Sequence, residues 1–280
     1  MSNSSQTHQI LELAPLGKKS SYINTYTPSL LFPIPRKPKR DEIGLSEELP
    51  FSGFDFWTGF EISWLNLRGK PVVAIGEFKI PANSRCLIES KSFKLYLNSF
   101  NNSKFLDFNQ VREIMISDLS QAVEAPVEVS LVSLQGQSCV ISTLDGQCLD
   151  DLDVECSEYQ PNPQYLRTLQ NRVEETVFTH LLKSNCLVTG QPDWGSIQIA
   201  YQGQQIDHQG LLKYIVSLRD HNEFHEQCVE RIFTDLVRFC APEKLTVYAR
   251  YTRRGGLDIN PLRTNQKDLV CPRNLRLIRQ

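Results

Sequence analysis

The sequence lacks several features that would assign a protein to a class at once. No apolar run approaches the roughly 18 residues that span a bilayer, and no charged start followed by an apolar core marks an export signal. The eight cysteines form no CxxC pair, which disfavours a zinc ribbon and a small disulfide scaffold. Charge of one sign is also missing, because 30 Lys and Arg oppose 32 Asp and Glu. We therefore expect a cytoplasmic protein with reduced thiols that binds neither a membrane nor, directly, nucleic acid.

What is present is enough chain for two domains. The 280 residues are 40% hydrophobic, which is typical of a folded protein, and one domain usually takes roughly 100–200 residues. Five prolines between positions 28 and 50 predict a loop-rich leader over residues 1–50. A stretch rich in Gly, Gln, Ser and Asp begins at 135, so we predict one module over 51–150 and another over 151–280.

The two predicted modules repeat one order of elements. In the first, apolar strand patterns over 60–67 and 72–80 precede helical patterns over 92–100 and 108–119 and a strand over 127–134. In the second, strands over 173–185 and 194–202 precede two helices, near 211–218 and 229–240, and strands over 244–252 and 257–265. Tyr96 to Phe100 parallels Tyr214 to Leu218, and Asp-Leu recurs at 118–119 and 235–236. We predict an α+β fold of duplicated antiparallel sheets whose open edges favour an oligomer.

One segment combines a thiol and a carboxyl group. Cys186 ends a predicted strand, and Asp193 follows across a Gly-Pro turn that can fold the carboxyl group back toward the sulfur. The alternative interpretation is a buried cysteine that packs as a small hydrophobic residue.

A second segment gathers His221, His225 and Cys228 at spacings of four and three. If one helix ran through all three, they would share a face and suit zinc. The interpretation we favour is that Asp220 or Asn222 caps a helix that begins near residue 223, which leaves His225 and Glu226 beside its start.

A third segment, from Glu89 to Leu97, places serines and Lys91 at a predicted helix start. Such a start can hold a phosphate, but it is also compatible with a solvated, charge-balanced turn. No GxGxxG and no GxxxxGK[ST] motif accompanies it, so a Rossmann or P-loop nucleotide site is unsupported.

These three segments together resemble a known family. ESKSFKLYL, CLVTGQPDW and HNEFHEQC occur in the order seen in the two-module NADPH-dependent 7-cyano-7-deazaguanine reductases, the nitrile reductases of queuosine biosynthesis, a tRNA-modification pathway. The resemblance extends from PSLLFPIPR in the leader to the carboxyl-terminal end. It implies tandem tunnelling-fold modules, that is, antiparallel sheets with paired helices on one face, and it makes a homodimer the expected assembly.

The resemblance also implies roles for individual residues. Cys186 would be the nucleophile that forms a covalent thioimide, and Asp193 the proton donor. The substrate 7-cyano-7-deazaguanine would be bound by a set from both modules: Ile88, Glu89, Ser90, His225 and Glu226. Two molecules of NADPH would supply the electrons, held by Ser90, Lys91, Arg254 and Gly255, and no metal is expected.

Two other functions remain open. Tunnelling-fold relatives include zinc-dependent GTP cyclohydrolases, in which case Cys186, His225 and Cys228 would be metal ligands. A non-catalytic module for a purine or for tRNA would use the basic block at 36–40 and the tail from Arg273 to Arg279, although both segments are also typical of solvated surface.

Overall fold

The computed structural model describes residues 22–135, 140–268 and 274–280. These residues form two compact units, which we describe separately. Unit 1 contains residues 22–46, 55–135 and 253–258, and unit 2 contains 47–54, 140–252, 259–268 and 274–280. Arg273 of the basic tail lies outside the described residues. In the part of the chain that is described, no helix is both long enough and apolar enough to cross a membrane.

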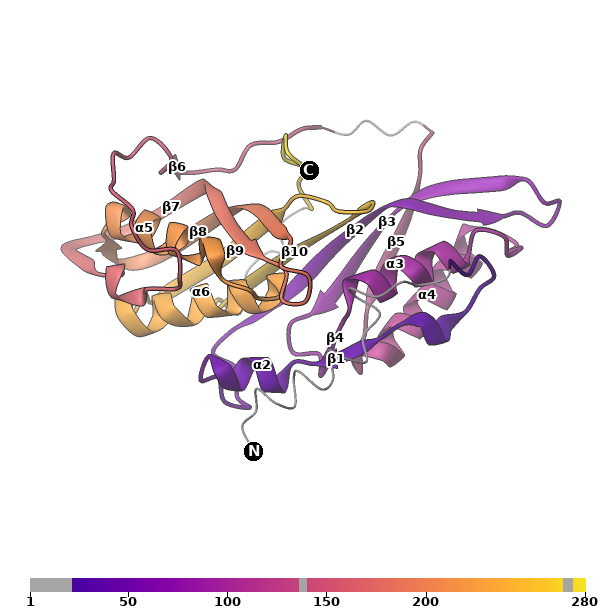
Figure 1. Cartoon of the computed structure of the whole chain (residues 1–280), viewed down its shortest axis with the longest axis horizontal. Coiled ribbons are helices and arrows are strands. Elements are labelled where there is room, and N and C mark those ends of the chain that lie inside the picture. Colours follow the sequence, from indigo (N-terminus) through magenta and orange to yellow (C-terminus); the bar gives the residue numbers. More distant parts are fainter. Residues whose placement is uncertain (1–21, 136–139, 269–273) are drawn as a thin grey trace. The chain divides into compact units, whose positions relative to one another are not determined.

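Unit 1 pairs strands with two consecutive helices (Figure 1). Its strands run in the order β5-β3-β2, and β5 pairs antiparallel with β3. An aromatic cluster fills its interior, with Phe93 packed against both Trp57 and Phe78. The elements assigned mainly to this unit are η1 (Pro28–Leu30), β1 (Pro33–Pro35), α2 (Lys37–Glu42), β2 (Ser52–Leu65), β3 (Pro71–Pro81), β4 (Cys86–Ile88), α3 (Ser90–Ser99), α4 (Phe108–Val123) and β5 (Glu128–Ser133).

Unit 2 repeats this arrangement of strands and two helices (Figure 1), and its hairpin strands, with 18 and 15 residues, are longer than the 14 and 11 residues of the hairpin in unit 1. Its strand order is β10-β9-β8-β7-β6, antiparallel except that β6 runs parallel to β7. Ile197, Ile199 and Tyr201 are buried and Gln198 and Ala200 are half-buried, which matches the predicted alternation, whereas Ser196 is buried as well. The elements are β6 (Gln147–Cys148), η2 (Pro163–Tyr165), β7 (Thr168–Asn185), β8 (Pro192–Ile206), α5 (His208–Ser217), η3 (Leu218–Asp220), α6 (His225–Cys240), β9 (Lys244–Tyr251) and β10 (Leu257–Thr264).

The repeated sequence corresponds to repeated hydrogen bonds. The Tyr96 hydroxyl donates to Asp118 at 2.7 Å in unit 1, and the Tyr214 hydroxyl donates to Asp235 at 2.7 Å in unit 2. In unit 1 the Ser99 hydroxyl donates to the Tyr96 carbonyl oxygen and accepts from the backbone N–H of Thr27, just before η1. In unit 2 the Ser217 hydroxyl donates to the Tyr214 carbonyl oxygen and accepts from the backbone N–H of Asn162, just before η2. Matching tertiary contacts of this kind support a duplication of one structural unit.

The leader contains more regular structure than its prolines predict. Pro38 lies in the first turn of α2, where its missing N–H removes no helical hydrogen bond. The basic block on this helix is charge-balanced, because Lys37 pairs with Asp41 and Lys39 with Glu42. Arg36 is buried in a 2.5 Å ion pair with Asp55. Arg36, Lys37 and Lys39 of the basic block are therefore paired with carboxylates of unit 1.

Candidate functional site

Cys186 lies at the start of the turn that joins β7 and β8. Its backbone N–H donates to the carbonyl of Gln191 at 2.8 Å, and its own carbonyl accepts from Gly190 at 3.0 Å. Gly190 has φ +65°, a left-handed conformation that glycine adopts without strain. The cysteine is only 6% exposed. The turn thus holds the thiol at a fixed point at the end of a two-stranded scaffold.

Asp193 is placed at the same end of this hairpin by strand pairing. In the register of β7 with β8, Asp193 lies opposite Ser184, two residues before the cysteine. Its side chain is buried, and its Oδ1 lies 3.8 Å from Nε2 of His225. A buried carboxyl group beside an imidazole is an arrangement that can hold and deliver a proton.

The third sequence segment is attached to the end of β7 by backbone hydrogen bonds. Asn185 N–H donates to the carbonyl of His221 at 2.8 Å, and Glu223 N–H donates to the carbonyl of Asn185 at 3.0 Å. This short bridge brings residues 221–225 next to the cysteine-bearing turn. It depends on a contact between segments distant in sequence, so no local pattern predicts it.

The helix after this bridge begins later than predicted. α6 starts at His225, and its N-cap is Phe224, which makes no side-chain cap hydrogen bond, so the predicted cap by Asp220 or Asn222 is wrong. The backbone bridge to Asn185 keeps residues 221–223 extended and delays the helix. His221 therefore lies outside the helix that carries His225 and Cys228. Within residues 22–135, 140–268 and 274–280, no group of three His, Cys, Asp or Glu side chains could hold a metal ion.

A buried ion pair between Glu223 and Arg231 joins the segment 221–223 to helix α6. Arg231 of α6 donates to the Glu223 carboxylate from two nitrogens, one of them at 2.8 Å, and His221 Nε2 lies 3.1 Å from the same oxygen. Burial disfavours the charged form of Glu223, but the hydrogen bonds from His221 and Arg231 hold its pKa below the ordinary value. Burial and the charge of Glu223 raise the pKa of Cys228 to about 12, so this thiol stays protonated.

Tyr251, at the end of β9, is a neighbour of the site that the sequence analysis missed. Its ring meets the His225 ring edge-on, with centroids 4.1 Å apart and planes at 83°. It is fully buried, and its hydroxyl lies beside Cys228 and Ser184. Burial raises its pKa well above the ordinary value, so it is a neutral tyrosine. Only the pairing of β9 with β8 brings it here.

In unit 1, Glu89 is the N-cap of α3 and is completely buried. Its two carboxylate oxygens accept from the backbone N–H groups of Lys91 at 2.6 Å and Ser92 at 2.7 Å. Burial raises the pKa of Glu89, while these two N–H groups and the charges of Lys94 and Lys91 act against that rise. The neighbouring Ile88 is buried at the end of β4. Each carboxylate oxygen keeps lone-pair capacity for a second donor.

Arg254 and Gly255 form a tight turn in the same unit. Arg254 N–H donates to Leu257 at 3.0 Å, and Gly255 has φ +57°. A Cβ atom on Gly255 would lie 3.4 Å from the side-chain carbons of Lys94 on α3. Unit 1 therefore brings the predicted cofactor residues of this turn next to the helix that carries Ser90 and Lys91. Basic side chains with a side-chain-free backbone turn suit a phosphate-bearing ligand.

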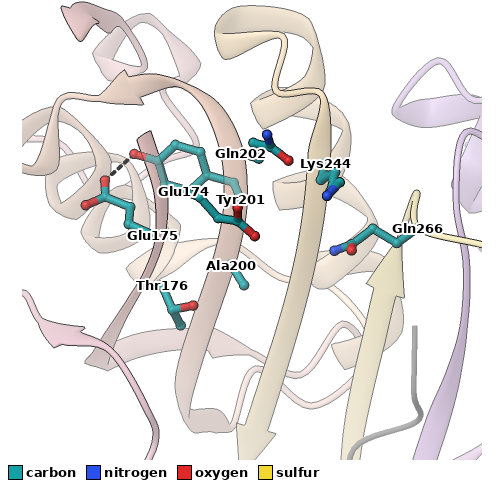
Figure 2. A pocket seen from close by; sticks show the side chains of 8 residues that line it. All are labelled: Glu174, Glu175, Thr176, Ala200, Tyr201, Gln202, Lys244 and Gln266. Carbon is teal, nitrogen blue, oxygen red and sulfur yellow. Dashed lines mark hydrogen bonds between the residues drawn. The ribbon is translucent and has the colours of Figure 1, made fainter. Parts of the chain in front are cut away.

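The hollow drawn in Figure 2 lies elsewhere in unit 2. It has a volume of about 180 Å³, and its lining includes Glu174, Glu175, Tyr201 and Lys244. The Tyr201 hydroxyl and the Glu175 carboxylate are hydrogen-bonded to each other beside it (Figure 2). None of the residues that the sequence predicts for catalysis or binding lines this hollow.

Comparisons with known proteins identify the family. The family profile "Nitrile reductase, 7-cyano-7-deazaguanine-reductase N-term" matches residues 22–131, and the profile "QueF-like protein" matches residues 192–269. A relative from Delftia acidovorans, named NADPH-dependent 7-cyano-7-deazaguanine reductase, is 56% identical over 279 residues, covering 96% of this chain and 99% of its own.

A relative of the same name from Cupriavidus metallidurans is 58% identical over 276 residues, again covering 96% of this chain and 99% of its own. Among solved structures, an archaeosine synthase QueF-Like in the apo form covers 34% of this chain and 94% of its own at 14% identity, with a TM-score of 0.30, which is too low to carry an argument. The resemblance seen in the sequence is confirmed by the family profiles and the curated relatives: the chain belongs to the family of NADPH-dependent 7-cyano-7-deazaguanine reductases.

Proposed function

We propose that this protein reduces the nitrile of 7-cyano-7-deazaguanine to the aminomethyl group with two molecules of NADPH, as a step of queuosine biosynthesis. The observation that carries the proposal is the hairpin end of unit 2, where the Cys186 turn, Asp193 and the segment from His221 to His225 are held together by strand register and backbone hydrogen bonds. A thiol and a buried acid at the same end of a hairpin are the groups that nitrile activation needs.

The thiol solves the difficulty of the first step. A nitrile carbon is a poor hydride acceptor, but sulfur from Cys186 adds to it and forms a covalent thioimide, whose carbon accepts hydride more readily. As the sulfur–carbon bond forms, the S–H bond of Cys186 breaks and the nitrile nitrogen gains a proton. Asp193 donates that proton, and the proton released by the thiol replaces it. The buried position of Asp193, beside the His225 imidazole, supports this assignment because both groups can exchange protons.

The remaining steps balance with two hydrides and two protons. NADPH, when bound, supplies hydride to the substrate carbon. The first hydride converts the thioimide to a tetrahedral adduct, which expels the Cys186 sulfur to give an imine, and the second hydride converts the imine to the amine. The protein's part is to hold the carbon near the thiol, to provide protons at nitrogen and to exclude water while the imine exists.

Substrate and cofactor recognition are assigned to both units. Carboxylates suit the N–H-rich edge of a deazapurine because charged acceptors make strong hydrogen bonds. We assign that edge to Glu89 and Glu226, each a buried acid at a helix start of its own unit, and we assign Ile88, Ser90 and His225 as further substrate-binding residues. The phosphates of NADPH would be held by Ser90, Lys91, Arg254 and Gly255, and the closeness of Gly255 to Lys94 of α3 supports this grouping.

The finer fold and the assembly belong to the same proposal. We assign the two units to tandem tunnelling-fold modules, because each has an antiparallel sheet followed by two helices and the two share matching Tyr–Asp hydrogen bonds. We infer a cytoplasmic homodimer that acts on the free base, since the near-neutral net charge of -2 provides little general attraction for tRNA.

The test is NADPH oxidation by the purified full chain with and without 7-cyano-7-deazaguanine. C186A should abolish both the covalent adduct, seen as a mass increase of the intact protein, and nitrile-dependent NADPH oxidation. C156A, which alters a partly exposed cysteine outside strands β7 and β8, is the matched control. Turnover retained in C186A would refute the mechanism. Activity lost to a chelator, with one tightly bound zinc per chain, would instead favour a cyclohydrolase-like enzyme.

A further inference from the structure

We infer that Tyr251 is a positioning residue, whose ring holds the His225 imidazole beside the Asp193 carboxyl group and so sets proton delivery to the nitrile nitrogen. This inference rests on the proposed function and deepens it. Tyr251 is the last residue of β9, far along the chain from the hairpin, and it belongs to none of the three sequence segments that carry the family resemblance.

The geometry leaves the imidazole dependent on its neighbours. His225 Nε2 lies 3.8 Å from Asp193 Oδ1, which is beyond a hydrogen bond but within reach of one after a small rotation of the ring. His225 is the first residue of α6, so its side chain projects from a helix end. The Tyr251 ring is nearly perpendicular to the imidazole ring, with the two centroids 4.1 Å apart, so it is the neighbour that limits such a rotation.

Tyr251 is itself fixed from several sides. Its N–H donates to Asn260 Oδ1 at 3.0 Å, and its carbonyl accepts from Gln280 Nε2 at 2.9 Å. It pairs with Gly195 across β8, and a Cβ atom there would lie 3.1 Å from the tyrosine ring. The side chains of Asn260 and Gln280 therefore fix the backbone of Tyr251 by hydrogen bonds, and Gly195, which has no side chain, leaves space for the tyrosine ring.

Strand pairing connects this tyrosine to the acid as well as to the imidazole. Gly195 lies two residues after Asp193 on β8, and Thr252 N–H donates to the carbonyl of Trp194 at 2.8 Å. The tyrosine and the acid are therefore anchored to the same few residues of one strand. We infer from this placement that the Tyr251 ring fixes the direction of the His225 imidazole relative to the Asp193 carboxyl group.

The experiment replaces the flat ring by a flexible apolar chain. Y251L should lower kcat for nitrile-dependent NADPH oxidation by about 10- to 100-fold, the size of effect expected when a reacting group is misplaced by about 1 Å. KM for NADPH should stay unchanged, and the pH profile of kcat should shift. Y251F, which keeps the ring, should recover most of the loss. The control is Y201L, because Tyr201 is also buried in unit 2 but its hydroxyl binds Glu175.

A double-mutant cycle separates positioning from a general loss of structure. If Tyr251 acts through His225, Y251L should reduce kcat no further in the H225A background. An equal loss in both backgrounds, or the same loss in Y201L, would overturn the inference. If Y251L does not fold, Y251M takes its place in the same cycle. A wild-type protein that fails to reduce the nitrile would refute the proposed function instead, so the two failures are distinguishable.

Discussion

Replacing Glu89 by glutamine tests whether this buried carboxylate binds substrate or only caps a helix. Both of its oxygens already accept a backbone N–H, at 2.6 and 2.7 Å, so any substrate bond uses a second lone pair on one of them. A hydrogen bond to a charged group contributes about 1.5–3 kcal/mol. Since about 1.4 kcal/mol corresponds to a factor of ten, E89Q should weaken substrate binding by about 10- to 100-fold.

The same substitution should have a smaller effect on stability. Glutamine has one acceptor oxygen, so one of the two capped N–H groups loses its partner, and losing a cap costs about 1 kcal/mol. Removing a charge from a fully buried position offsets part of that cost. D107A is the matched control, because Asp107 caps α4 through a 2.9 Å bond to Gln110 N–H and belongs to no proposed site.

The assay is calorimetric titration of 7-cyano-7-deazaguanine in a C186A background, which prevents covalent capture. E89Q/C186A should lose affinity, whereas D107A/C186A should lose only stability in urea unfolding. Equal substrate affinity in E89Q/C186A and C186A would refute a binding role for Glu89 and leave it a structural cap.

Acid titration provides an independent check on Glu89. Burial raises its pKa above that of an ordinary glutamate, although two N–H groups and two lysines oppose the rise. Substrate binding that needs the carboxylate should therefore weaken as pH falls through this raised pKa, at a higher pH than an ordinary glutamate would give. The raised pKa also means that the stability contributed by Glu89 is present at low pH and lost as pH rises through it.

Three further substitutions test the proton donor and the duplication. D193N should still form some covalent adduct in intact-mass measurements but reduce it at least about 100-fold more slowly, the usual contribution of a general acid; reduction at the wild-type rate would refute the proton role. Y214F should lower the free energy of unfolding in urea by about 1.5–3 kcal/mol, because Asp235 loses its tyrosine donor. Y96F should lower it less, since Tyr26 still donates to Asp118 at 2.8 Å, and an equal loss would contradict this.

The sequence predicted those parts of the molecule that depend on local pattern. The order of strands and helices, the alternation along β8 and the hairpin that links Cys186 to Asp193 all lie within short windows of chain. The start of α6 was wrongly predicted, because the bridge from Asn185 to residues 221–223 overrides the local capping preference. Tyr251 was missed for the same kind of reason, since only the pairing of β9 with β8 brings it to His225.

The corresponding hairpins of the two units differ at the position where unit 2 carries the proposed nucleophile. Asn66 follows β2 as Cys186 follows β7, and each residue donates its N–H across the turn and accepts from a glycine N–H, at 2.9 Å from Gly69 in unit 1 and 3.0 Å from Gly190 in unit 2. In unit 1 the Asn66 side chain accepts two N–H bonds within its own turn, at 3.0 Å each.

The Asn66 side-chain oxygen is used by the hydrogen bonds of its own turn, whereas among the described residues the Cys186 thiol makes no hydrogen bond of this kind to its turn. The Cys186 turn closes through the backbone groups of Cys186, Gly190 and Gln191, and it has one more residue than the Asn66 turn. The reverse holds at the first helix of the repeated helix pair, which is α3 in unit 1 and α5 in unit 2. Glu89 caps α3 from a fully buried position, while Asp207, which precedes α5, makes no cap bond and pairs with Arg167 at 2.7 Å. Each unit has thus specialised at a different point of the same fold, unit 1 with a buried carboxylate and unit 2 with a thiol, so substitutions at equivalent positions should have unequal effects on catalysis.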